Sequence, residues 1–235
     1  MKILEVKKIE KTLANKKVLH KNTFSVKAWE IYGFLWPNGA GKTTTLKCIM
    51  WLIEPESWEI YIFGKKWLSI KSKKKIGFMP ENTYLYKHLT WKEFLEFNGK
   101  FFWIEWKKLD KRVNELLIRV WLENDWSKYL SEFSKWMLQR IWLAQSIINK
   151  PKLLFLDEPM SGLDPIWRKM VKDLLVSLRN EWTTIFFNTH ILADVESICD
   201  RISIIHKGYM IVEGKEVSSI KGSLEDFFIE KVSNA

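Results

Sequence analysis

The sequence predicts an α/β fold with a mostly parallel sheet at its core. Short apolar runs such as IYGFL at 31–35 and LLFL at 153–156 have the composition of strands buried on both faces. Segments with apolar residues at helical spacing separate these runs, and strands that alternate with helices are typical of parallel sheets. With 235 residues, 47% hydrophobic and 28% charged, the chain is long enough for one such domain with a sizeable core.

The expected elements alternate along the chain after an N-terminal part, residues 1–35, of strands and turns. Further strands are expected at 59–64, 75–79, 153–156 and 183–188, followed by a hairpin-like pair within 201–214. Helices are expected at 42–50, 109–120, 137–150, 166–180 and 191–199, with one more opened by a capping box at Thr90 and Glu93. The helical stretch from about 83 to 150 predicts a helical subdomain inserted into a single domain of residues 1–235.

The composition limits the possible partners and location. The net charge of +10 comes from scattered lysines and from no recognisable nucleic-acid-binding module, so we predict no nucleic-acid partner. A lysine-rich composition explains this charge most simply, and attraction to nucleotide or to an anionic inner leaflet is the alternative. No apolar run approaches the ~18 residues that span a bilayer, and the first residues do not resemble a signal peptide. We therefore expect a cytosolic protein, with Cys48 and Cys199 as reduced thiols in its core.

The segment WPNGAGKT at 36–43 is the first motif that points to chemistry. It matches the phosphate-loop pattern G-x-x-x-x-G-K-[ST] except at its first position, and it lies between an expected strand and an expected helix. Backbone N–H groups of such a loop bind phosphate oxygens, the lysine reaches the β- and γ-phosphates, and the hydroxyl of Thr43 ligates Mg²⁺. A plain glycine-rich turn is the alternative. The predicted nucleotide-binding residues are Trp36, Pro37, Asn38, Gly39, Ala40, Gly41, Lys42, Thr43 and Thr44.

An acidic pair, Asp157 and Glu158, follows the apolar strand LLFL. Both carboxylates then lie at the carboxyl edge of the sheet, where ligands of α/β proteins bind. Asp157 is predicted to hold Mg²⁺ and Glu158 to polarise the attacking water. Taken alone, such a pair is more often a helix cap, but the phosphate loop upstream and the SGLD segment just downstream favour the functional interpretation.

Three further segments resemble the ATP-binding proteins of ABC transporters: FSKWMLQR at 133–140, SGLD at 161–164 and Asn-Thr-His at 188–190. The first resembles the family signature Leu-Ser-Gly-Gly-Gln, with Ser134 retained and Lys135 and Trp136 at the two glycines. SGLD resembles the D-loop, which crosses the dimer interface. His190 resembles the switch histidine that hydrogen-bonds the γ-phosphate.

The resemblance covers nearly the whole chain and implies an ABC-type P-loop NTPase fold that binds ATP and Mg²⁺ and couples ATP hydrolysis to transport. It implies a head-to-tail homo- or heterodimer, with ATP between Lys42 of one subunit and Ser134 of the other, and a D-loop contact through Asp164. Glu81 occupies the place of the Q-loop glutamine, which links the ATP site to the transporter contact. The implied partner is a separate integral membrane permease of ABC-2 type. The implied location is cytoplasmic, peripheral on the inner face of the cell membrane.

Other classes remain as alternatives. They are a non-transport ABC ATPase, a regulatory nucleotide-binding subunit with a degenerate site, and another P-loop enzyme such as a kinase. The changed signature at Lys135 and Trp136 supports the regulatory subunit, whereas the intact phosphate-loop lysine and acidic pair oppose it. SGLD and His190 disfavour a kinase. The N-terminal aromatic that stacks on adenine in many family members is replaced by Leu13.

The tryptophan content is abnormal, with 14 Trp against 10 Gly. Ten tryptophans stand where the family commonly has glycine: Trp29, Trp36, Trp51, Trp58, Trp67, Trp121, Trp136, Trp142, Trp167 and Trp182. The other four, Trp91, Trp103, Trp106 and Trp126, are expected in loop-like contexts. Because glycine alone enters positive φ freely, we hypothesise that UGA codons read as glycine in some bacterial lineages have been translated as tryptophan. A deliberately mutated or designed chain is the alternative.

Overall fold

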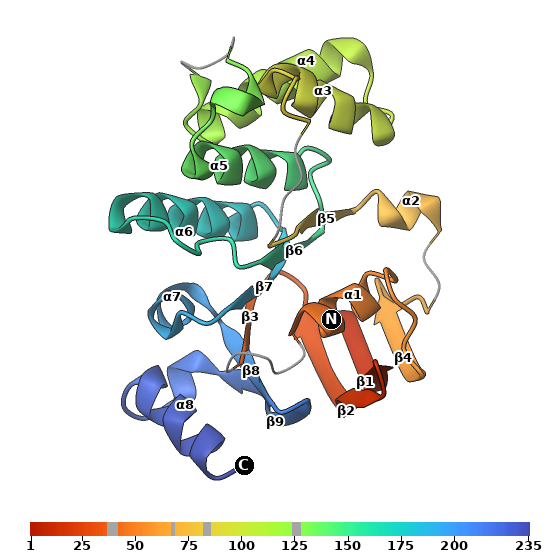
Figure 1. Ribbon diagram of the computed structural model, residues 1–235, viewed down its shortest axis with the longest axis vertical. Coiled ribbons are helices and arrows are strands. Elements are labelled where there is room, and N and C mark those ends of the chain that lie inside the picture. The colour runs from red at the N-terminus through yellow and green to blue at the C-terminus, as the bar shows by residue number, and fades with distance from the viewer. Residues whose placement is uncertain (37–41, 67–68, 82–85, 124–127) are drawn as a thin grey trace.

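The computed structural model describes residues 1–36, 42–66, 69–81, 86–123 and 128–235, and its strands form two sheets (Figure 1). The strands are β1 (Lys2–Leu13), β2 (Lys16–Lys27), β3 (Ile31–Leu35), β4 (Ser57–Ile62), β5 (Ile76–Met79), β6 (Leu153–Asp157), β7 (Thr184–Thr189), β8 (Arg201–His206) and β9 (Tyr209–Glu216). The helices are α1 (Lys42–Ile49), α2 (Ile70–Lys73), α3 (Trp91–Phe101), α4 (Trp106–Arg119), α5 (Lys135–Ser146), α6 (Pro165–Asn180), α7 (Leu192–Ile198) and α8 (Leu224–Ser233).

The larger sheet has the strand order β5-β6-β7-β3-β8-β9. The neighbouring strands from β5 to β8 pair in parallel, and β9 pairs antiparallel with β8 as a hairpin. Every residue of β3, β6 and β7 is buried, which explains why these strands read as continuous apolar runs in the sequence. The prediction of a mixed sheet that is mostly parallel is therefore confirmed.

The smaller sheet, β2-β1-β4, is antiparallel. Its apolar face packs on the larger sheet around a cluster of rings: Phe24, Tyr32, Phe34 and Phe186 have centroids 5.4–6.4 Å apart in the contacting pairs. The sequence predicted strands in this region, but it gave no sign that they form a sheet of their own. That arrangement depends on which face of the β1–β2 hairpin packs against the aromatic cluster, and this is a contact between distant segments.

Helices α3, α4 and α5 follow one another between β5 and β6 and lie together at one end of the molecule (Figure 1). The predicted capping box at the start of α3 is confirmed. The Thr90 hydroxyl accepts a hydrogen bond from the Glu93 N–H at 3.3 Å, and the Glu93 carboxylate accepts one from the Thr90 N–H at 2.8 Å. Helix α5 begins two residues before its predicted start because Ser134 caps it, and it ends at Ser146 rather than at Lys150.

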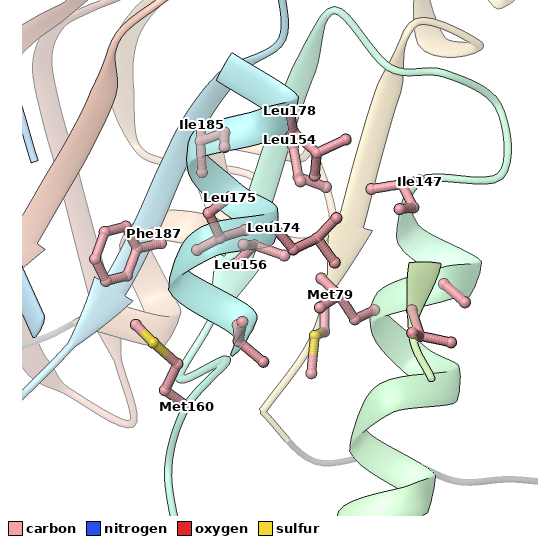
Figure 2. Packing of buried hydrophobic residues seen from close by; sticks show 14 of the residues in the cluster. Met79, Ile147, Leu154, Leu156, Met160, Leu174, Leu175, Leu178, Ile185 and Phe187 are labelled. Carbon is pink, nitrogen blue, oxygen red and sulfur yellow. The ribbon is translucent and has the colours of Figure 1, made fainter. Parts of the chain in front are cut away.

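The ring cluster between the two sheets is one hydrophobic core. A second hydrophobic core fills the space between α5, α6 and the larger sheet. Figure 2 shows Leu154 and Leu156 of β6 facing Leu174 and Leu178 of α6, with Ile147 at the end of α5 beside them. These side chains are at most 6% exposed. Because α5 and α6 share this core with β6, the segments that precede and follow the acidic pair are held in fixed positions relative to it. Both cysteines are buried and free.

Five of the tryptophans that the structure describes have backbone angles in the left-handed region: Trp29 (φ 65°), Trp51 (60°), Trp103 (60°), Trp121 (55°) and Trp182 (70°). Four of them stand two residues after the last residue of a helix, namely of α1, α3, α4 and α6. This is the position at which helices commonly end with a left-handed glycine. A bulky residue with these angles is an outlier.

The hydrogen bonds at three of these helix ends are those of a Schellman motif. After α4, the Trp121 N–H donates to the carbonyl of Ile118 at 3.1 Å, and the next N–H donates to the carbonyl of Leu117 at 2.9 Å. The same pair of bonds follows α1 at Trp51 and α6 at Trp182. The backbone therefore has the form that glycine adopts at a helix end, although the residue is tryptophan.

Two of the other tryptophans lie at the starts of helices. The expectation of loop-like contexts is wrong for Trp91 and Trp106, which are the first residues of α3 and α4. Trp91 is fully buried, because its place in the first turn of α3 faces the core. Trp67 and Trp126 lie outside the described residues.

Candidate functional site

Three predicted motifs lie at the carboxyl ends of neighbouring strands, at one edge of the larger sheet. Strands β3, β6 and β7 run parallel, and residues at their carboxyl ends pair as neighbours, Leu35 with Thr189 and Asp157 with Asn188. The phosphate-loop motif starts directly after β3. Asp157 is the last residue of β6 and Glu158 follows it, while His190 directly follows β7. Ligands of open α/β sheets bind at such an edge, outside the carboxyl ends of the strands.

Only part of the predicted phosphate loop can be described. Pro37, Asn38, Gly39, Ala40 and Gly41 lie outside the described residues. Lys42, Thr43 and Thr44 form the first turn of α1, and the side chains of the two threonines are half-buried. The N–H groups of this first turn have no partner within the helix, and the helix dipole favours an anion at this end.

The acidic pair is buried, with Asp157 and Glu158 each 3% exposed. The Asn188 side-chain amide donates a hydrogen bond to Asp157 Oδ1 at 3.2 Å, and the Glu158 N–H donates to the Asn188 carbonyl at 3.0 Å. Glu158 has a φ of 54°, which is uncommon for a residue other than glycine. Backbone angles of this kind cluster at functional sites, where the surrounding structure holds them in place.

His190 contacts Glu158 directly. The distance between His190 Nδ1 and Glu158 Oε1 is 2.7 Å, and the two residues come from neighbouring strands, at the ends of β7 and β6. A carboxylate accepts hydrogen bonds, so in this contact His190 Nδ1 is the donor. The His190 side chain is 51% exposed while that of Glu158 is 2% exposed. The histidine therefore connects the buried carboxylate to the surface of the sheet edge.

A cleft of about 200 Å³ brings three predicted residues together, Glu81, Asp157 and Glu158. Its remaining lining is Met79, Lys135, Leu138, Gln139 and Ser161. Glu81 follows β5 and the other two acids end β6, so the pairing of these strands accounts for their approach. The predicted Q-loop residue and the acidic pair thus share one concave, largely polar site.

Gln139 is a residue of this site that the sequence interpretation passed over. Its side-chain amide donates to the carbonyl of Pro159 at 2.7 Å and to that of Glu158 at 3.4 Å. Gln139 thereby fixes the turn that follows the acidic pair to helix α5. The sequence did contain a signal for this role, because Gln139 belongs to the segment FSKWMLQR that resembles the family signature and begins α5.

Two other predicted residues serve as helix caps. The Ser134 hydroxyl accepts a hydrogen bond from the Met137 N–H at 3.3 Å and begins α5. The Asp164 carboxylate accepts from the N–H groups of Ile166 and Trp167 at 2.9 and 3.0 Å and begins α6. Neither side chain lines the cleft. Their nucleotide contacts, which the resemblance places across a dimer interface, stay predictions.

The two tryptophans of the nucleotide motifs pack against their own chain. Trp36 is 1% exposed, with its ring centroid 5.9 Å from that of Phe34, so its side chain belongs to the core and not to the cleft. Trp136 is half-buried, and a Cβ placed on Gly162 would meet its six-membered ring at 3.3 Å. The Trp136 indole therefore fills the space between the start of α5 and the SGLD segment.

A buried carboxylate joins the helices that follow the SGLD and Asn-Thr-His segments. Asp194 of α7 is 1% exposed, and its oxygens lie 3.7 Å from Arg168 Nε and 3.7 Å from Lys172 Nζ of α6. Burial raises the pKa of Asp194, and the two cations partly oppose this rise. Helix α6 follows the SGLD segment and α7 follows the Asn-Thr-His segment. The cluster of Asp194, Arg168 and Lys172 therefore holds the two segments in place relative to each other.

The residues at the sheet edge fit a magnesium ion. Mg²⁺ prefers oxygen ligands and takes few of them from the protein, keeping waters and substrate phosphates for the rest. Thr43 lies in the first turn of α1 and Asp157 is the last residue of β6, at the same edge of the sheet. Leu13, which stands where an adenine-stacking aromatic was expected, is the last residue of β1 and 40% exposed.

A phosphate-loop motif, a buried Asp-Glu pair and a histidine hydrogen-bonded to that glutamate, all at the carboxyl edge of a parallel sheet, are the features of the P-loop NTPase fold. The family model described as ABC transporter matches residues 19–161. The chain belongs to this family of ABC transporter ATP-binding proteins, and both the fold class and the resemblance predicted from its motifs are confirmed.

Similar proteins agree with this assignment. An ABC transporter ATP-binding protein of Synechocystis sp. is 41% identical over 229 residues, covering 95% of this chain and 64% of that protein. The bacitracin transport ATP-binding protein BcrA of Bacillus licheniformis is 37% identical, covering 90% of this chain and 69% of its own length. A solved structure of the ATP-binding subunit of an ABC transporter superposes with a TM-score of 0.89 at 29% identity, covering 97% of this chain and 99% of that one.

The chain therefore spans less than two thirds of the Synechocystis relative's length. Within the part of the chain that the structure describes, no helix is both long and apolar enough to cross a membrane.

Proposed function

We propose that the chain binds ATP and hydrolyses it to ADP and phosphate, and that it energises a separate integral membrane permease. The observation that carries this proposal is the contact of 2.7 Å between His190 and Glu158 at the edge where the phosphate loop begins. A carboxylate held by a histidine beside a triphosphate-binding loop is placed to orient a water for attack on the terminal phosphate.

Each residue of the edge has a part in this reaction. Lys42 carries the positive charge for the β- and γ-phosphates, and the N–H groups of the loop and of the first turn of α1 bind their oxygens. Thr43 and Asp157 hold Mg²⁺, which neutralises charge on the phosphates when bound. Glu158 accepts a hydrogen bond from the attacking water, while His190 fixes the orientation of that carboxylate and faces the γ-phosphate. Glu81 lines the same cleft as the acidic pair.

We propose one ATPase domain, residues 1–235, with the stretch from about 83 to 150 as its helical subdomain. Two such domains pack head to tail, so that Ser134 and Asp164 of one subunit approach the nucleotide of the other. Both side chains are exposed in the single chain, as such a role requires. The dimer is a homodimer or a heterodimer.

The permease is proposed to dock in a cavity of about 390 Å³ between the helical stretch and the two sheets. Its lining includes Phe78 of β5, Pro80 directly after that strand, Phe102 after α3 and Trp142 of α5. This mostly apolar cavity adjoins the segment that carries Glu81, so a partner seated there is linked to the ATP site. The subunit is then cytoplasmic and peripheral on the inner face of the membrane.

The proposal is tested by measuring steady-state phosphate release from ATP in two forms of the chain. The tryptophan form is the chain as printed, and the glycine form carries glycine at all 14 tryptophan positions. We expect turnover in the glycine form that requires Mg²⁺. Tight ATP binding without turnover would instead support a regulatory subunit with a degenerate site, the alternative that the changed signature at Lys135 and Trp136 favours. Purification together with a permease would separate a transporter subunit from a non-transport ATPase.

A further inference from the structure

Lysine and aromatic side chains gather where helix α2 meets the junction between α3 and α4. Figure 1 shows α2 and this junction on the same side of the molecule. We call this surface the α2–α4 face. It comprises Ile70, Lys71, Lys73, Lys74, Lys100, Phe101, Trp103, Trp106, Lys107, Lys108 and Lys111.

Direct contacts join the parts of the α2–α4 face into one surface. The Lys74 ammonium lies 3.7 Å from the ring centroid of Trp103, and the Lys100 ammonium lies 5.5 Å from that of Trp106. A hollow of about 500 Å³ is lined by Lys74 from the α2 side and by Lys108 and Lys111 from α4. Residues distant in the sequence therefore present their charges together.

The charge of this face is strongly positive. Seven of its eleven residues are lysines, and the segments 70–74 and 100–111 that carry it contain two acidic residues. Both acids are engaged in ion pairs, Glu105 with Lys108 at 2.6 Å and Asp110 with Lys92 at 2.8 Å. Glu115, which also lines the hollow, lies 3.5 Å from Arg112. The excess positive charge thus points to an anionic partner.

The exposed aromatic side chains favour a lipid bilayer as this anionic partner. Phe101 is 63% exposed, Trp103 is 81% exposed and Trp106 is 59% exposed. Lysines mixed with exposed aromatic rings are typical of surfaces that lie on an anionic bilayer, where the rings enter the headgroup region and the ammonium groups meet phosphates. The glycine form lacks both indoles, and its exposed apolar side chains on this face are Phe101 and Ile70, which is 73% exposed, beside the seven lysines.

The position of the face agrees with a membrane partner. Lys73 at the end of α2 and Phe102 after α3 also line the cavity that we propose as the permease dock. A subunit seated on a permease through that cavity would turn the adjoining α2–α4 face toward the same bilayer. We propose that the α2–α4 face binds the anionic headgroup surface of the membrane that holds the permease. This inference rests on the proposed function, because only a subunit at the membrane meets that surface.

The test uses two triple variants of equal charge change in the glycine form. The face variant is Lys71→Gln, Lys107→Gln and Lys111→Gln, and the control variant is Lys8→Gln, Lys21→Gln and Lys221→Gln. All six lysines are exposed, and the three control lysines lie on β1, on β2 and before α8. Binding is measured by co-sedimentation with vesicles of phosphatidylglycerol and phosphatidylcholine, and with vesicles of phosphatidylcholine alone.

We expect binding to the anionic vesicles only, weakened by added salt. Each lysine at an anionic surface contributes about fivefold in affinity, so the face variant should bind roughly 100-fold more weakly. The control variant should change binding less than about threefold, because its lysines lie on other elements and attraction between exposed charges is screened over about 10 Å. Equal losses in both variants, or equal binding to both kinds of vesicle, would overturn the inference.

Two further readouts separate this inference from the proposed function. Melting temperatures of both variants should match that of the parent protein, which excludes a loss of fold. ATP turnover should also be unchanged in both, since neither variant touches the sheet edge. A face variant that binds vesicles normally but no longer purifies with a permease would overturn the inference and make the face a protein contact. Vesicle binding through this face by a chain without ATPase activity would contradict the proposed function alone.

Discussion

His190 Nδ1 lies 2.7 Å from Glu158 Oε1, and this contact joins the end of β7 to the end of β6. The glutamate is buried while the histidine is half exposed. The pair therefore presents a buried carboxylate, held in one orientation, at the edge where the nucleotide is proposed to bind.

The first prediction concerns Glu158. In the glycine form, Glu158→Gln should keep ATP binding and slow hydrolysis on the order of 10²–10⁴-fold, the usual contribution of a positioned acid or base. The ATP-bound dimer should also persist longer on size-exclusion chromatography. Glu213→Gln, an exposed change on β9, is the matched control and should have no effect. Parental turnover in Glu158→Gln would assign the role to another residue.

The second prediction concerns the coupling of the two residues. If His190 acts by fixing Glu158, His190→Ala should slow turnover, and the double variant with Glu158→Gln should be little slower than Glu158→Gln alone. Residues that act as a unit give such non-additive losses. Single-turnover rates of the four proteins measure the coupling. Losses that multiply would show that His190 works independently of the glutamate.

The third prediction concerns Lys42. Lys42→Ala should weaken MgATP binding about 10- to 100-fold, because it removes a charge-assisted contact with the phosphates. Lys47→Ala is the control, since Lys47 is an exposed lysine on the same helix. Isothermal titration with ATP measures both. An unchanged affinity in Lys42→Ala would remove the phosphate-loop assignment.

The fourth prediction concerns the tryptophans at helix ends. Trp103→Gly and Trp182→Gly should each raise the free energy of unfolding by about 1 kcal/mol, because glycine adopts the left-handed conformation without strain. Both side chains are largely exposed, so little buried area is lost. Trp106→Gly is the control, because Trp106 is also exposed but begins α4 without a positive φ. Denaturant titration should show a gain for the first two and none for the control.

The fifth prediction compares the two complete forms. The tryptophan form should show little or no ATPase activity, and the glycine form should be active. The Trp136 ring stands over Gly162, on the side of α5 that the resemblance turns toward the second subunit, and would hold the two subunits apart. Since the Trp36 ring is buried in the core, ATP binding is expected to survive better than turnover. Equal turnover in both forms would make the tryptophans genuine, as would a UGG codon at one of the 14 positions.

Much of the fold could be predicted because it depends on local patterns. The buried parallel strands β3, β6 and β7 appear as continuous apolar runs, and Thr90 with Glu93 marks the start of α3. The phosphate loop and the acidic pair are read from short motifs in the same way. The division of the strands into two sheets could not be predicted, since strand order is fixed by packing between distant segments.

The sequence by itself determined the class of site: a loop for phosphates, two carboxylates after a buried strand and a histidine after another. Only the tertiary structure decided that His190 contacts Glu158, that Glu81 shares their cleft, and that the Trp36 ring is buried. The physical reason is the range of the interactions. A motif records which groups the chemistry needs, whereas strand register and core packing, which act between residues far apart in the chain, decide which of those groups touch.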